Sequence, residues 1–123
     1  MNTESLALQV VPTDDDDAED VHDLSVRLRA TLLDLDVASV DPVPEVGPDG
    51  AKGLGTVLGA LMVGLGAAER IARVLRTIGA WVRHTGRTVE IRADGDVLKL
   101  TNVSAEQQNR LIDAWLERHA PRD

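Results

Sequence analysis

Side chains that could perform catalysis are present in this chain, but their spacing matches no known catalytic pattern. The three histidines, His22, His84 and His119, are far apart, and none lies in a metal-binding spacing. The absence of cysteine excludes disulfides, thiolate zinc sites and thiol nucleophiles. No serine lies in a nucleophile-elbow motif. We therefore predict that the protein is not an enzyme and has no catalytic, cofactor-binding or metal-binding residues.

Acidic side chains cluster near the N-terminus, at Asp14–Asp17, Glu19 and Asp20. The cluster lacks the alternating oxygens, the turn glycine and the distal Glu of a calcium-binding loop. Carboxylates at the start of a helix complement its dipole. We expect this segment to begin a helix or to contact a basic surface.

Arginines dominate the segment from 70 to 92, which holds six Arg and one acid, Glu90. Arg70, Arg73 and Arg76 recur at three-residue steps. Two interpretations stay open: this stripe docks an acidic partner, a phosphate or RNA, or it is a solvated face that balances the acidic first half. Residues 1–52 hold 13 acids and 3 bases, whereas 53–123 hold 8 acids and 10 bases. The net charge of −8 argues against general nucleic-acid binding.

An apolar, glycine-rich segment lies in the middle of the chain, with 16 uncharged residues between Lys52 and Glu69. This is shorter than the roughly 20 residues that a membrane-spanning helix needs. Small residues at four-residue spacing, such as Gly55 and Gly59, permit close approach of another helix or a sheet. Burial within the domain, binding to a protein partner and membrane contact remain as interpretations. We predict that the partner-binding residues are Leu54, Val57, Leu58, Leu61, Met62, Leu65, Arg70, Arg73 and Arg76.

The elements that must position these residues follow from hydrophobic periodicity, turn residues and caps. The patterns predict strands at Ser5–Val11, 37–43, 87–93 and 96–102, and helices at about 17–34, 54–83 and 105–119. Pro44 to Gly55 reads as a flexible loop, and Asp94-Gly95 as a hairpin turn. Whether the long helix breaks near Gly64–Gly66 stays open. The expected fold is one α+β domain, order β-α-β-α-β-β-α, with a small mixed sheet of about four strands and helices packed on it.

Several segments carry a resemblance to a known family. They are LALQVV, LRATLLDLDVASVDPV, the GAKG loop followed by TVLGALMVGLG, and the C-terminal RTVEIRADGDVLKLTNVSAEQQNRLIDAWLERHA. Together they resemble the effector-associated constant component family, type one, of actinobacterial conflict systems. The resemblance implies a small accessory protein, encoded beside effectors such as trypsin-like or caspase-like peptidases, with no catalytic residues to carry over.

The leading hypothesis is therefore a non-enzymatic adaptor of a bacterial defence system that binds an effector and self-associates. The alternative is a nucleotide- or RNA-sensing domain that uses the stripe from Arg70 to Arg83. A membrane-active module through residues 54–68 comes third. The N-terminus shows no signal peptide, so we expect a cytoplasmic protein.

Overall fold

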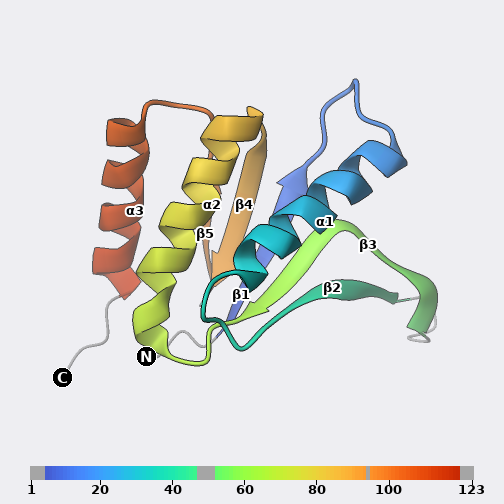
Figure 1. Cartoon of the computed structure of the whole chain (residues 1–123), viewed down its shortest axis with the longest axis horizontal. Helices are drawn as coiled ribbons and strands as arrows, with labels where there is room; N and C mark the ends of the chain where they lie inside the picture. Colours follow the sequence, from blue (N-terminus) through green and yellow to red (C-terminus); the bar gives the residue numbers. More distant parts are fainter. Residues whose placement is uncertain (1–4, 47–51, 94, 120–123) are drawn as a thin grey trace.

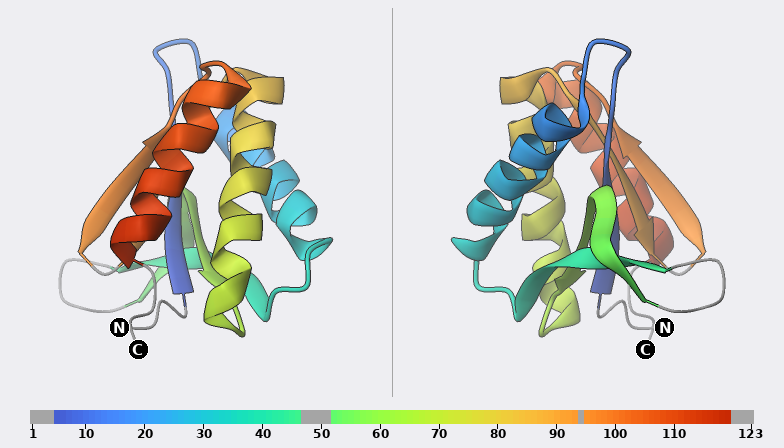
Figure 2. Two further views of the ribbon diagram at one scale, coloured as in Figure 1. Left: turned by 90° about the vertical axis from the view of Figure 1, so that its left-hand side faces the viewer. Right: turned by 90° about the vertical axis from the view of Figure 1, so that its right-hand side faces the viewer.

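A computed structural model describes residues 5–46, 52–93 and 95–119, with side chains described outside 44–58 and 68. The molecule has two layers, a sheet and three helices that lie on the same side of it (Figures 1 and 2). The elements in chain order are β1 (Ser5–Val11), α1 (Ala18–Leu33), β2 (Ser39–Val46), β3 (Lys52–Gly64), the 3-10 turn η1 (Ala68–Arg70), α2 (Ile71–Thr85), β4 (Thr88–Ala93), β5 (Asp96–Leu100) and α3 (Ala105–His119).

The sheet has five strands in the order β2-β3-β1-β4-β5, and all four pairings are antiparallel. The α+β class is thus confirmed, but the sheet is larger than predicted and is not mixed. Strands β1 and β2 run parallel to each other with β3 between them, which makes β1-α1-β2 a split β-α-β unit. Strands β3 and β4 form a second such unit around β1. This interleaving is the ferredoxin-like arrangement, extended here by β5 and α3.

The hydrophobic core lies between the sheet and the helices. Alternate residues of β1, Leu6, Leu8 and Val10, point into it, as strand geometry requires. The helices contribute apolar stripes, including Leu28 and Leu32 from α1. The core residues from the second half of the chain are Val74, Leu75, Ile78, Trp81, Val82, Val89, Ile91, Ala93, Leu98, Leu100, Ile112 and Trp115.

The predicted helix over 54–83 is wrong in its first half. Residues 52–64 form β3, the chain turns at Gly66 with a positive φ of 78°, and the helix α2 begins only at Ile71. A helix would hold Gly55, Gly59 and Gly64 in its interior, at about 1 kcal/mol each relative to alanine. A strand at this place instead pairs on both sides, with β2 and with β1.

The loop predicted from Pro44 to Gly55 is shorter than expected, because β2 continues to Val46 and β3 begins at Lys52. Its remaining part, residues 47–51, lies outside the described residues. The other predicted elements are confirmed with small shifts at their ends. Ala93 pairs with Asp96 across the predicted hairpin. The Ser104 hydroxyl accepts a hydrogen bond from the Gln107 N–H and so caps the start of α3.

Candidate functional site

The face of the sheet opposite the helices is not covered by any of the described helices (Figure 2). Residues that alternate with the core positions point to this side, since side chains in a strand alternate between faces. We name it the open face. Its described residues are Ser5, Ala7, Gln9, Val11, Asp41, Ala60, Met62, Gly64, Thr88, Glu90, Arg92, Val97 and Lys99.

Met62 and Ala7 form an apolar pair near the centre of the open face, and charged residues lie on the strands to either side of them. Met62 on β3 is 41% exposed and lies beside Ala7 in the register of β1 with β3. Val97 on β5 is exposed to a similar degree. Asp41 flanks Met62 on the β2 side, and Arg92 flanks Ala7 on the β4 side. A solvent-facing side of an antiparallel sheet is normally polar, so an exposed methionine among small residues is a feature to explain.

Of the predicted apolar site residues, the structure places only Met62 on a surface with a described side chain. Leu61 and Leu65 are buried in the core, Leu61 at 2% exposure and Leu65 at 0%, so neither is available to a partner. Leu54, Val57 and Leu58 lie along β3, and their side chains are outside the described part of the chain. Among the predicted apolar residues with described side chains, Met62 is the one that is exposed.

The arginines of the predicted stripe do not act together, because two of them make separate contacts within the molecule. Arg70 lies 3.1 Å from the Asp36 carboxylate, and it also donates a hydrogen bond to the Leu65 carbonyl. Arg76 lies 2.6 Å from the carboxylate of Asp113 on α3. Arg73 is exposed, and no ion pair to it is found among the described residues. The three side chains do not converge on a common point.

The arginines that follow are also engaged. Arg83 donates to the buried Gln108 side chain, and Arg92 forms a long ion pair of 3.8 Å with Glu90. Arg87 lies 2.6 Å from the carboxylate of Asp16. A binding site for phosphate or RNA needs guanidinium groups that point outward together. Most of these guanidinium groups instead contact other side chains of the molecule.

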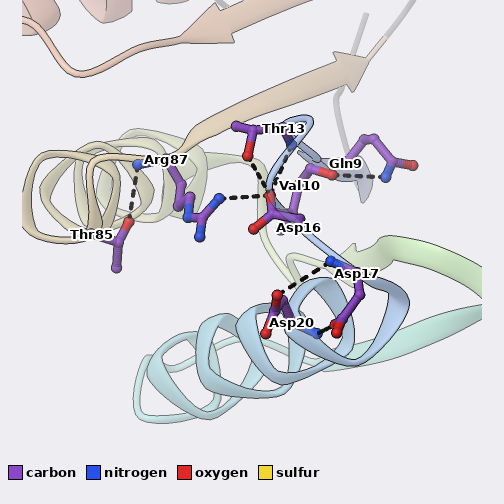
Figure 3. Close-up of polar contacts among 8 residues, drawn as sticks. All are labelled: Gln9, Val10, Thr13, Asp16, Asp17, Asp20, Thr85 and Arg87. Carbon is purple, nitrogen blue, oxygen red and sulfur yellow. Dashed lines mark hydrogen bonds and ion pairs between the residues drawn. The ribbon is translucent and has the colours of Figure 1, made fainter.

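The acidic segment serves the folding of the chain at the start of α1 (Figure 3). Asp16 is only 3% exposed and accepts hydrogen bonds from the Thr13 N–H, the Thr13 hydroxyl and Arg87. The Thr13 N–H, together with Arg87, lowers the pKa of Asp16 below its ordinary value of 3.8. Asp17 caps α1 in a reciprocal capping box with Asp20. Both predicted roles, helix entry and contact with a basic group, are confirmed.

A second acid, Asp96, lies between His119 and Arg118 at the C-terminal end of α3. Its carboxylate is 2.8 Å from the His119 Nε2 and 3.1 Å from Arg118. The hydrogen bond with His119 is the main cause that lowers the pKa of Asp96. The His119 ring also lies 4.1 Å, centroid to centroid, from that of Trp115. These contacts fasten the end of α3 to the start of β5.

Small-molecule and metal chemistry find little support in the described geometry. Two hollows, one beside Val37 and Arg73 and one beside Asp23 and Arg87, have volumes of about 70 and 180 Å³. Ligand pockets usually enclose about 300–1,000 Å³. Within the described ranges, no three His, Asp or Glu side chains gather where a metal ion could bind. No described helix is long and apolar enough to cross a bilayer.

Sequence reasoning missed most of the open face. Ala7, Asp41 and Arg92 come from three different strands, and their proximity depends on the strand register. The alternation of β1 and β4 indicates one solvent-facing side. The sequence pattern predicts a helix in place of β3, the strand that connects β1 and β4 to Asp41, so the link to Asp41 is lost.

Comparison with known proteins gives this chain no relatives. No family model, no curated protein and no solved structure matches it. Its function must therefore be argued from its own residues.

Proposed function

We propose that this protein is a non-enzymatic adaptor that works by binding another protein through the open face of its sheet. The observation that carries the proposal is the exposed Met62 on a sheet face that no described helix covers, next to the small residues Ala7, Ala60 and Gly64. An apolar centre with a polar rim is the usual anatomy of a protein-binding surface. The resemblance to effector-associated components of bacterial conflict systems supports the choice of partner, an effector such as a trypsin-like or caspase-like peptidase.

The alternative, a nucleotide- or RNA-sensing domain, takes second place. The six arginines from 70 to 92 were its main support. Four of them are ion-paired within the molecule, and Arg83 is hydrogen-bonded to Gln108. Charges that are already matched contribute less to phosphate binding, because each contact requires an existing pair to be broken.

The test is binding of the purified protein to candidate effectors of the trypsin-like and caspase-like peptidase classes, measured by titration calorimetry. Met62→Asp places a charge at the apolar centre, so we expect affinity to fall by about tenfold or more, as for other central interface residues. Leu111→Asp is the matched control, because Leu111 is exposed to a similar degree on α3.

We expect the control to bind within about twofold of wild type. Equal affinity of wild type and Met62→Asp would contradict the use of the open face. A loss seen only with Leu111→Asp would move the interface to the helical side.

A further inference from the structure

One row of residues crosses the open face in the order Asp41, Met62, Ala7, Arg92. These residues lie on β2, β3, β1 and β4, and each is the direct register partner of the next. The row has a large apolar side chain beside a small one at its centre. An acid stands at one end and a base at the other. When the row is set against a second copy that runs in the opposite direction, the acid faces the base and the large apolar side chain faces the small one.

A two-fold axis that runs along the strands, between β3 and β1, superposes this row on its reverse. Met62 then faces Ala7 of the second copy, and Asp41 faces Arg92 of the second copy. Two-fold interfaces use the same patch on both subunits, so every contact occurs twice. We infer that the open face binds a second copy of this chain in this register. The inference rests on the proposed role of the open face in protein binding. If both hold, a second copy of the chain and the effector compete for the same surface.

The neighbouring rows allow the close approach that this pairing needs. The same axis sets Ala60 opposite Gln9 of the second copy, and Gly64 opposite Ser5 of the second copy. Each Met62 therefore has Ala60 and Gly64 beside it on its own strand and faces Ala7 of the second copy, with Ser5 and Gln9 of that copy on either side. The small side chains among these give Met62 room to insert. Sheets packed face to face keep their strands roughly aligned, within about 30°, as this axis requires.

The charges at the ends of the row are available for contact across the axis. Asp41 is exposed, and no ion pair to it is found in the described ranges. Arg92 is 68% exposed in its side chain, and its contact with Glu90 is long at 3.8 Å. Because β5 lies beyond β4, Val97 and Lys99 fall at the rim of the interface.

The expected dimer is reversible. Four overlapping strands at a spacing of about 4.8 Å give a contact roughly 19 Å wide. A contact of this width buries an area at the small end of the range for specific interfaces. We expect a dissociation constant in the micromolar range, visible as a mass that rises from one chain to two across a concentration series in light scattering.

Charge reversal tests the register. D41R sets like charges against Arg92 of the second copy, and R92D sets them against Asp41 of the second copy, so each protein alone should lose at least tenfold in self-affinity. The double variant D41R/R92D restores both opposite-charge contacts and should dimerise again. An equimolar mixture of D41R and R92D should form heterodimers for the same reason. K99E is the control at the rim and should dimerise like wild type.

Trapping with a short thiol-specific bifunctional cross-linker gives a second measurement that does not depend on charge. The linker is needed because sheets packed face to face lie about 10 Å apart, which exceeds the reach of a direct disulfide. The natural chain has no cysteine, so M62C and A7C each introduce one thiol, and mixing the two proteins allows only bonds between chains. A cross-linked heterodimer is expected from this mixture but not from M62C with L111C. A wild-type protein that stays monomeric at all concentrations would overturn the inference, as would a double variant no tighter than the single ones or equal trapping in both mixtures.

The two proposals fail separately. If the protein alone is monomeric and Met62→Asp still weakens effector binding, the dimer is wrong and the adaptor function stands. If the charge reversals follow the expected pattern and the effector does not bind, the dimer stands and the proposed function is wrong.

Discussion

At the scale of single residues, Gly79 on α2 lets α3 pack closely, because its lack of a side chain leaves room for Gln108. Gly79 lies in the middle of α2 and is buried. A Cβ at this position would be 2.5 Å from Oε1 of Gln108, which is itself fully buried on α3. Gln108 is held there by Arg83 and by a 3.5 Å hydrogen bond to the Thr101 carbonyl. The Gln108 amide therefore occupies the space that a side chain at position 79 would need.

Gly79→Ala should destabilise the protein although alanine favours helices. Overpacking a core position costs about 1–3 kcal/mol, and the helical gain of about 1 kcal/mol offsets only part of it. We expect a net loss of about 1 kcal/mol in the free energy of unfolding, measured with urea. In a protein that already carries Gln108→Ala, the Gly79→Ala substitution should no longer lower the free energy of unfolding, because the crowding Gln108 side chain is gone. A stabilised Gly79→Ala protein would disprove this account of the contact.

At the scale of elements, two contacts tie the chain's segments across long distances in the sequence. The hydrogen bonds around Asp16 join the loop before α1 to Arg87 at the start of β4 (Figure 3). Those around Asp96 join β5 to the end of α3. In both places the folded state lowers the pKa of the carboxyl group. Each group therefore stabilises the fold in its ionised form.

The pH dependence of stability follows from the direction of these shifts. Because the folded pKa of Asp16 lies below the unfolded value, its contribution is complete above about pH 5 and is lost as the pH falls through the folded pKa. Asp16→Asn should lower the urea midpoint at pH 7, and its difference from wild type should narrow towards pH 3. Asp15→Asn, in the same loop and exposed, is the control. A difference that is constant with pH would contradict this assignment.

The elements that could be predicted from sequence are those specified by local signals. β1 alternates cleanly, Ser104 caps α3, and Asp94-Gly95 marks a hairpin. β3 could not be predicted in this way, because its glycines and alanines fit a helical and an extended period equally well. Its strand conformation comes from pairing with β2, the preceding element, and with β1, which lies far from it in the sequence. For the same reason Met62 was identified but the row through Asp41 and Arg92 was not.

At the scale of the whole molecule, the acidic first half and the basic second half of the chain meet within one domain. Asp16 and Asp36 from the first half pair with Arg87 and Arg70 from the second. The asymmetry seen in the sequence is thus partly neutralised by folding and does not require a charged partner. The extension β5-α3 belongs to the same core, since Trp115 is fully buried within it.

Trp115→Ala should therefore weaken the whole fold and not α3 alone. Loss of a buried tryptophan typically costs about 3–5 kcal/mol, and we expect circular dichroism and Trp81 fluorescence to report one shared transition. Trp115→Phe should cost much less, because the Trp115 Nε1 is buried and has no hydrogen-bond partner among the described residues. Leu111→Ala, exposed on the same helix, should change stability by about 0.5 kcal/mol or less. Separate transitions for α3 and the sheet would refute a shared core.

The two prolines of β2 limit how copies of this protein can assemble. β2 is one of the two edge strands of the sheet, and Pro42 and Pro44 within it have no N–H to donate. An added strand would find an interrupted row of donors there, which disfavours sideways growth into filaments at this edge. If the open face pairs two copies as inferred above, the two-fold symmetry closes that assembly at a dimer.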